Sequence, residues 1–239
     1  MINYNVSTPT WEWVHKRSPA PRHRRRLILK LLKNLDFGQC LDVGCAQPYL
    51  LEDLRQMRPD LKIAGCDISQ TVIEANRRRF PDAEFFVMDL AKAHDVRGQF
   101  DLVTCSEVLE HIAEWRQALE TLARLSRRWL LVTVPCGSVF PIDEIVGHRQ
   151  HFQGPDLLDA CRGYGFKPVR AFHWGFPFHS LYRRMINSLC PERVYRSFAQ
   201  QDWGPAKWAL SSVLYGLFFL NDPFRCGSQF IALLEKSRA

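Results

Sequence analysis

The chain has 239 residues, of which 46% are hydrophobic and 24% charged, and it carries a formal net charge of +7. This length fits one large domain with added segments, and the composition is that of an ordinary globular protein. The eight cysteines include no C-x-x-C pair, and residues 1–10 lack the apolar core of a signal peptide. These features argue against a disulfide-rich secreted protein, so we expect a reducing compartment and a cytoplasmic location.

Strand-like and helix-like segments alternate along most of the chain. An N-terminal arm with Trp11 and Trp13 leads to a basic helix at about 20–34. The pattern then predicts five strands with helices between most of them, at about 39–43, 61–66, 84–88, 100–105 and 129–134. A helix at about 155–162 and strands at about 167–174 and 229–235 follow. This order predicts an α/β fold built from right-handed β-α-β crossovers.

Three aspartates each end an apolar, strand-like run. They are Asp42, Asp67 and Asp89, and each follows the previous one by about the length of one helix and one strand. A fourth segment, 100–111, closes the series. The carboxyl ends of parallel strands share one edge of the sheet, and open α/β folds bind their ligands in the crevice at that edge. We therefore expect these side chains to meet in one site.

The turn after the first strand distinguishes between two classes of ligand. A pyrophosphate needs the pattern G-x-G-x-x-G, which lets backbone N–H groups approach the phosphates closely. Here the turn keeps only Gly44 and places Ala46 and Pro48 further along. Alanine disfavours positive φ and proline fixes φ, although Pro48 could begin the following helix. The turn therefore argues against a dinucleotide.

From about Phe37 to Gly175 these motifs resemble the class I S-adenosylmethionine-dependent methyltransferases, whose turn is typically acidic-x-Gly-x-Gly-x-Gly. The resemblance implies a Rossmann-like fold with a seven-stranded, mostly parallel sheet and helices on both faces. S-adenosyl-L-methionine would be the cofactor. The chain would then consist of an N-terminal arm and basic helix (1–36), a cofactor-binding core (37–174), a helical insertion between the last two strands (175–228) and the final strand (229–239).

The resemblance also assigns the cofactor-binding residues. Asp42 and Gly44, with Cys45 beside them, would line the methionine part. Asp67 would accept both ribose hydroxyls, with Ile68 next to it. The remaining contacts would be Met88, Asp89 and Leu90 at the adenine, and Ser106 with Glu107 at the sulfonium. Any one of the aspartates could instead be a helix N-cap or turn former.

The segment E-V-L-E-H, residues 107–111, with a later histidine resembles small-RNA 2′-O-methyltransferases and ubiquinone-pathway O-methyltransferases. In both, carboxylates and imidazoles hold a divalent ion. That resemblance implies a site for Mg²⁺, Mn²⁺ or Zn²⁺ made by Glu107, Glu110, His111 and His148, a ligand set that suits these ions. His151 could replace His148. Alternatively the segment holds no metal and His111 is a general base. In either case Glu107 and His111 are the expected catalytic residues.

Residues 175–228 depart from a minimal fold. Their apolar run, 208–220, is too short to span a membrane. It predicts a buried helix in an acceptor lid or a dimer contact. The alternative is an apolar cap for a lipid-like substrate, or a peripheral membrane contact. The sequence leaves the oligomeric state open.

Basic clusters at 16–17, 22–26 and 77–79 account for much of the net charge. The first two form either the solvated face of a helix or a contact with an anionic partner such as RNA, a membrane surface or a phosphorylated substrate. Taken together, the sequence favours O-methylation of a small or lipid-like acceptor. An RNA methyltransferase and a non-catalytic binding protein on a degenerate fold are the alternatives.

Overall fold

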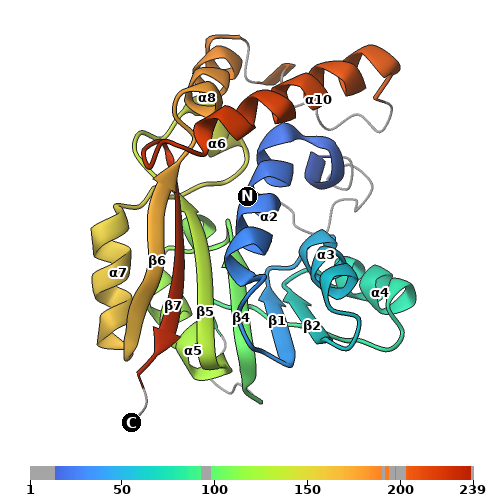
Figure 1. Ribbon diagram of the computed structural model, residues 1–239, viewed down its shortest axis with the longest axis vertical. Coiled ribbons are helices and arrows are strands. Elements are labelled where there is room, and N and C mark those ends of the chain that lie inside the picture. The colour runs from blue at the N-terminus through green and yellow to red at the C-terminus, as the bar shows by residue number, and fades with distance from the viewer. Residues whose placement is uncertain (1–13, 93–97, 190–191, 194–196, 198–202, 238–239) are drawn as a thin grey trace.

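A seven-stranded sheet in the order β3-β2-β1-β4-β5-β7-β6 forms the centre of the computed structural model (Figure 1). The structure describes residues 14–92, 98–189, 192–193, 197 and 203–237, so Trp11 and Trp13 lie outside the described residues. The strands are β1 (Gln39–Val43), β2 (Lys62–Asp67), β3 (Glu84–Val87), β4 (Phe100–Ser106), β5 (Ser126–Pro135), β6 (Phe166–Trp174) and β7 (Gln229–Lys236). The first five are parallel, and β7 runs antiparallel to both its neighbours. The predicted fold class is confirmed.

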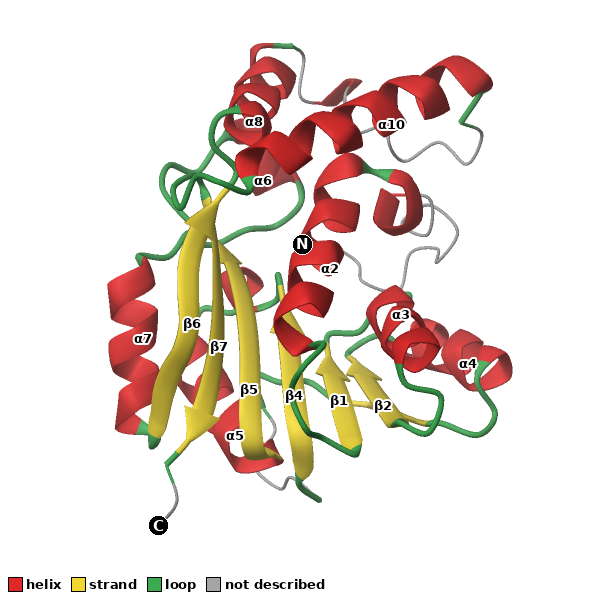
Figure 2. Ribbon diagram, in the orientation of Figure 1, coloured by secondary structure: helices red, strands yellow, loops and turns green. Residues whose placement is uncertain are grey.

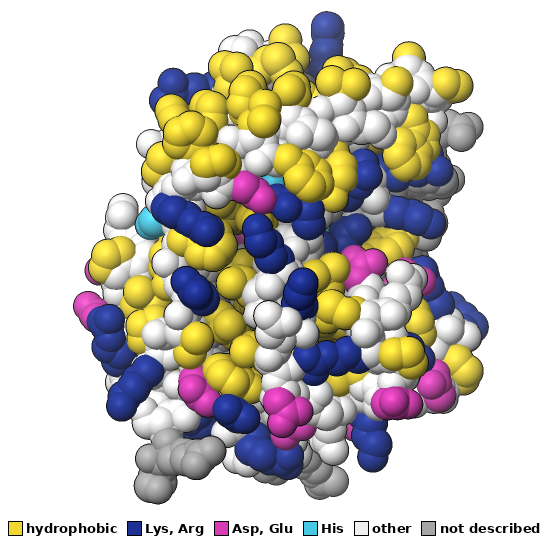
Figure 3. Space-filling view, viewed as in Figure 1, with side chains coloured by type: hydrophobic (Ala, Val, Ile, Leu, Met, Phe, Trp, Pro, Cys, Tyr) yellow, Lys and Arg dark blue, Asp and Glu magenta, His cyan; other side chains and the backbone are white. Residues whose placement is uncertain are grey.

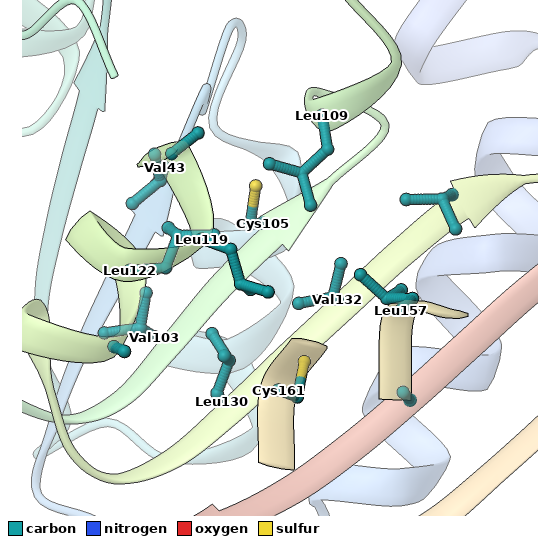
Figure 4. Packing of buried hydrophobic residues seen from close by; sticks show 14 of the residues in the cluster. Val43, Val103, Cys105, Leu109, Leu119, Leu122, Leu130, Val132, Leu157 and Cys161 are labelled. Atoms are coloured by element: carbon teal, nitrogen blue, oxygen red, sulfur yellow. The ribbon is translucent and has the colours of Figure 1, made fainter. Parts of the chain in front are cut away.

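Helices cover both faces of this sheet (Figure 2). One face carries α2 (Pro19–Leu32), α3 (Tyr49–Met57) and α4 (Gln70–Arg79), and the other carries α5 (Trp115–Leu125) and α7 (Gly154–Gly163). Apolar residues of α5 recur at helical spacing, so Leu119 and Leu122 reach the sheet together. There they pack with Val103, Leu130 and other strand residues in a core without exposed side chains (Figure 4).

The basic helix α2 is not the solvated face that one interpretation predicted. His23 and Ile28 are buried, and the arginines between them are only partly exposed. Three arginines form ion pairs with other parts of the chain: Arg24 with Glu107 at 3.3 Å, Arg25 with Asp53 at 3.1 Å and Arg26 with Asp222 at 2.5 Å. The prediction failed because these carboxylates lie far away in sequence and meet the helix only in the folded chain.

Between β6 and β7 the chain forms α8 (Phe178–Ser188), α10 (Pro205–Phe218) and the 3-10 turn η2 (Phe219–Asn221). With α6 (Pro141–Ile145), these helices lie beyond the carboxyl ends of β5 and β6 (Figure 1). Within the single chain only Ser211 and Phe218 of α10 are buried, so the expected burial of this helix is not reached there, and burial in a dimer contact stays a prediction. The helix packs against α2 and α8 on one side and leaves the other side open. Among the described residues no helix is long and apolar enough to cross a membrane.

Candidate active site

The turn after β1 is shaped by two residues in the left-handed region of φ. Gly44 has φ +70° and its N–H donates to the Cys66 carbonyl at 2.8 Å, which ties the turn to the end of β2. A Cβ at this position would stand 2.4 Å from Cγ2 of Val108. Only glycine fits here, both for its φ and for the close approach of the chain after β4.

Ala46 adopts φ +41°, although alanine disfavours positive φ. Two side chains hold it there. The Ala46 N–H donates to Oδ2 of Asp67 at 2.9 Å, and Nδ2 of Asn76 donates to the Ala46 carbonyl at 2.8 Å. These hydrogen bonds thus hold Ala46 at a positive φ, which the glycine usual at this position would adopt without help. Pro48 is the N-cap of α3 and not its first helical residue, which corrects the expected start of that helix.

Asp67 lies at the end of β2 and is partly exposed. Each carboxylate oxygen accepts one backbone N–H: Oδ1 from Ser69 at 3.0 Å and Oδ2 from Ala46. Burial raises the pKa of this carboxyl, and the backbone N–H groups of Ser69, Ala46 and Ile68 oppose the rise. A carboxylate oxygen can accept more than one hydrogen bond, so Asp67 keeps acceptor capacity for further donors.

Asp42 is buried at the end of β1. Its Oδ1 accepts a hydrogen bond of 2.6 Å from Oγ1 of Thr104 on β4. Burial raises the pKa of the Asp42 carboxyl to about 7; the Thr104 bond lowers it, and the nearby Asp67 charge raises it further. The group can therefore exchange its proton close to neutral pH.

We expect Asp42 to make the folded state less stable as the pH rises from about 4 to about 7. Its folded pKa lies above the unfolded value, so across this window the native state binds a proton that the unfolded state has lost. One pKa unit corresponds to about 1.4 kcal/mol, so the loss reaches at most about 4 kcal/mol. Urea unfolding of wild type and Asp42→Asn at several pH values measures it. A stability difference that does not change between pH 4 and pH 7 would contradict the assignment.

The residues after β2 and β3 form the next part of this edge. Ile68 is 47% exposed, Met88 is partly buried, and Leu90 is buried in the core. Oδ1 of Asp89 accepts the Ala91 N–H at 3.0 Å, as a turn-forming aspartate does. Apolar side chains thus lie beside a partly exposed carboxylate at this edge.

A chain of polar side chains follows β4. Oγ1 of Thr133 donates to Oε1 of Glu107 at 3.0 Å, so the Ser106 hydroxyl, 2.9 Å away, must donate to Thr133. Glu107 has φ +58°. Its other oxygen pairs with Arg24 of α2, whose side chain is also largely buried. The N-terminal helix thereby contributes a cation to this edge of the sheet.

Glu110 is fully buried, and among the described residues neither of its carboxyl oxygens has a hydrogen-bond partner. Burial, and after it the Glu107 charge, raises the pKa of Glu110 well above its ordinary value. Ligand atoms of Glu110, His111 and His148 all lie within 4.8 Å of one another. Glu107 is outside this group, so the structure brings together three of the four expected metal ligands.

The loop between α6 and α7 is hydrogen-bonded to residues of the cluster of Glu110, His111 and His148. The Arg149 N–H donates to the Glu110 carbonyl at 2.8 Å, and Nδ1 of His111 lies 3.1 Å from the Gly147 carbonyl. Since a carbonyl only accepts, Nδ1 carries the proton and the ring's lone pair is on Nε2. Burial lowers the pKa of His111, and burial with the neighbouring imidazoles lowers that of His148 to about 3. Both rings are neutral at neutral pH, as metal ligands and general bases must be.

A second group, made of Asp143, His148 and His151, shares His148 with the first, and its ligand atoms also lie within 4.8 Å of one another. Nδ1 of His148 is 3.2 Å from Nε2 of His151, and His151 approaches Asp143 at 3.5 Å. Asp143 is itself paired with the buried Arg183 of α8. His148 and His151 therefore point to the same region, which agrees with the alternative prediction that His151 could replace His148. Sequence reasoning missed Arg24, Asp143 and Arg183, because no motif connects residues so far apart.

The residues present fit both groups that the sequence implied. The turn from Gly44 to Ala46 is fixed, and Asp67 at its side can accept hydroxyl donors, which suits the ribose of S-adenosylmethionine. Glu110 has no hydrogen-bond donor in the described part of the chain, so the ionised form of its carboxyl lacks the compensation that a buried charge needs. A divalent cation beside it, with two neutral imidazoles, would supply that compensation.

Comparisons with known proteins agree with this geometry. A family model described as a methyltransferase domain matches residues 13–171. The ubiquinone biosynthesis O-methyltransferase of Alkalilimnicola ehrlichii is 30% identical over 137 residues, which cover 52% of this chain and 53% of that protein. The solved structure of magnesium protoporphyrin IX methyltransferase from Synechocystis, with bound SAH, has a TM-score of 0.60 at 16% identity and covers 98% of this chain and 96% of that one. Phosphoethanolamine N-methyltransferase 2 of Haemonchus contortus, in complex with S-adenosyl-L-methionine, has a TM-score of 0.65 at 15% identity and covers 99% of this chain and 59% of that one.

These matches differ in what they establish. The family model covers more than half of the chain. The structural neighbours share less than 25% identity with the chain and show the fold alone. The chain spans about half the length of the curated relatives it matches.

Proposed function

The chain belongs to the class I S-adenosylmethionine-dependent methyltransferases, and from that premise we propose that it transfers the methyl group of S-adenosylmethionine to an oxygen of a small or lipid-like acceptor. One observation carries the proposal. The turn at Gly44 and the carboxylate of Asp67 lie at the same edge of the sheet as the buried cluster of Glu110, His111 and His148. A cofactor site beside neutral imidazoles and a carboxylate supports transfer to a hydroxyl, which must lose a proton.

The bound cofactor supplies an electrophilic methyl group on a sulfonium ion. The chain's own residues bind and orient it. Asp67 would accept the ribose hydroxyls, with Ile68 adjoining, while Asp42 and Gly44 with Cys45 would line the methionine part. Met88 and Leu90 would pack beside the adenine, and Asp89 would accept from its amino group. Ser106 would face the sulfonium. The displacement is in line, so alignment and exclusion of water provide most of the acceleration.

His111 has one of two roles in this proposal. In the first, its neutral Nε2 takes the proton from the acceptor hydroxyl. In the second, Glu110, His111 and His148 hold Mg²⁺, Mn²⁺ or Zn²⁺, which would lower the pKa of a hydroxyl. Glu107 would hold Arg24 and Thr133 in place beside the cluster and would not be a ligand.

The insertion between β6 and β7 supports an acceptor that is small or lipid-like. Its helices lie beyond the carboxyl ends of β5 and β6, and Arg183 of α8 reaches Asp143 beside the histidines. We propose that the insertion is the acceptor lid. An RNA acceptor has less support, because Arg24, Arg25 and Arg26 already pair with carboxylates. A non-catalytic role has less support because bonds to Asp67 and Asn76 accommodate Ala46.

Asp67→Ala should weaken the binding of S-adenosylmethionine by about 1.5–3 kcal/mol, the cost of losing charge-assisted hydrogen bonds to the ribose. The substitution also removes the bond to the Ala46 N–H, so Asp67→Asn, whose amide oxygen can still accept that bond, should lose less. Isothermal titration of the cofactor measures both affinities. Unchanged affinity in a folded Asp67→Ala variant would show that the ribose lies elsewhere, and no binding to the wild type would refute the enzyme proposal.

A further inference from the structure

The helices of the insertion expose two regular rows of apolar side chains. On α8 the row is Leu181 and Met185, four residues apart, and Leu189 follows directly after the helix as its C-cap. On α10 it is Leu210 and Val213, continued by Leu220 in η2. Leu181 is 64% exposed, Leu210 60% and Val213 61%. We call these six residues the apolar face. Soluble monomers seldom expose apolar side chains in such an ordered group, and an ordered group marks a contact surface.

Two exposed aromatic residues extend the apolar face toward the sheet. The rings of Phe176 and Phe224 meet edge to face at 5.7 Å, and both are exposed. In Figure 3 hydrophobic side chains gather over α8 and α10, and a band of Lys and Arg side chains lies next to them over α2 and the strands. One face of the molecule therefore carries an apolar zone and a cationic zone in contact.

The cationic zone surrounds a cavity of about 660 Å³ at the edge of the sheet. Lys30, Arg170 and Arg225 line it together with Asp222, which pairs with Lys30 at 3.9 Å and also with Arg26. The apolar lining includes Leu31 and Phe172. The guanidinium of Arg225 lies 4.3 Å from the centre of the Phe172 ring. In the part of the chain that the structure describes, neither Arg170 nor Arg225 forms an ion pair with a carboxylate. These two cations have their charge available for an anion from outside.

We propose that the apolar face and the cavity beside it bind an anionic lipid surface. The apolar side chains would enter the boundary between headgroups and acyl chains. Arg170 and Arg225 would meet lipid phosphate or carboxylate groups. At 14 residues α10 is too short to span a bilayer, and its exposed row on one side is suited to lying in the plane of the interface. The net charge of +7 adds a long-range attraction to such a surface.

Charge decides against a second copy of the chain as the occupant. A two-fold contact places the same surface on both subunits, so the unpaired cations of both cavities would be brought to one interface. Like charges brought together in this way are unfavourable, whereas an anionic membrane is complementary to them. The proposal does not depend on the identity of the methyl acceptor, because it concerns a surface outside the cluster of Glu110, His111 and His148.

The test is sedimentation of the full chain with lipid vesicles, without cofactor or acceptor. One set of vesicles contains phosphatidylcholine alone and the other about one-third phosphatidylserine. We expect binding to the anionic vesicles to be about tenfold stronger or more and to weaken in high salt. Leu181→Ser with Leu210→Ser and Val213→Ser should lower it about tenfold or more, and Arg170→Gln with Arg225→Gln should also reduce its salt dependence.

Control variants carry changes of the same kind elsewhere on the surface. Met57→Ser removes one exposed apolar side chain and should bind vesicles as the wild type does. Lys62→Gln with Arg78→Gln lowers the net charge as much as Arg170→Gln with Arg225→Gln does, and it should weaken binding much less. Thermal unfolding checks that every variant is folded. Equal binding to both vesicle types, absent binding, or equal effects of test and control variants would overturn the proposal. A lipid-free dimer that Leu210→Ser dissociates would assign the face to a second copy instead.

Discussion

Gly44→Ala should reduce the affinity for S-adenosylmethionine by about 100-fold or more, a loss that a turn unable to keep its shape would produce. Two separate costs act on this residue. A new Cβ would stand 2.4 Å from Cγ2 of Val108, and φ at this position is +70°. The chain can relieve the contact by moving the turn, or by moving the side chain of Val108 in the segment after β4. Since the Gly44 and Cys45 N–H groups are bonded to the Cys66 carbonyl, the displacement would spread to the end of β2. Isothermal titration measures the loss directly.

Two further variants separate these costs. Gly44→Ala combined with Val108→Ala removes the methyl groups that the new Cβ meets and should recover part of the affinity, leaving the cost of positive φ. Gly165→Ala is the matched control, because its φ is +82° and nothing lies within 4 Å of the position of its Cβ. That variant should lose about 1 kcal/mol of stability and keep its affinity for the cofactor. Wild-type affinity in the Gly44→Ala variant would mean that the cofactor does not depend on this turn.

The fold could be predicted because its signals are local and repeated. Asp42, Asp67 and Asp89 mark three strand ends at one spacing, and the helices between them show helical periodicity in their own sequence. Strand boundaries were less accurate. The fifth strand begins at Ser126 and not near Trp129, because Arg127 and Arg128 at its start are exposed and pair with Asp101 and Glu235 on neighbouring strands. The sequence of one strand alone does not show which residues of the neighbouring strands pair with it.

The cofactor-binding residues of the site could be predicted from the sequence, but the surroundings of Glu110 and His111 could be predicted only in part. Glu110 and His111 adjoin in sequence, so their proximity follows from one turn. The position of His148 depends on a loop bonded to Glu110 and Gly147, and Arg24 reaches Glu107 from 83 positions earlier. The exposure of α10 could not be predicted either, because an apolar sequence does not show whether the outer side of its helix contacts protein, lipid or water.

Glu110→Gln should abolish the binding of a divalent cation, if Glu110, His111 and His148 hold one. Mn²⁺ is the probe, because its binding can be followed by titration calorimetry and by electron paramagnetic resonance. We expect a loss of about 100-fold or more, since changing even residues that only support a ligand costs about 10- to 100-fold. Glu110 is buried without a hydrogen-bond donor, and an uncompensated charge there is costly. Quantitative removal of the cation by a chelator should abolish methyl transfer, and Mg²⁺, Mn²⁺ or Zn²⁺ should restore it.

Glu107→Gln is the control for this prediction, since the two residues have the same chemistry and lie three positions apart. Glu107 is bonded to Thr133 and Arg24 and lies outside the group of ligand atoms, so its variant should keep the affinity for Mn²⁺. The metal-free account predicts a different pattern. Wild type would then bind no Mn²⁺, activity would survive exhaustive chelation, and His111→Ala alone would abolish it, because Nε2 of His111 would be the base. Full activity in His111→Ala would exclude both accounts, and the residues after β4 would then serve only to close the turn over the cofactor.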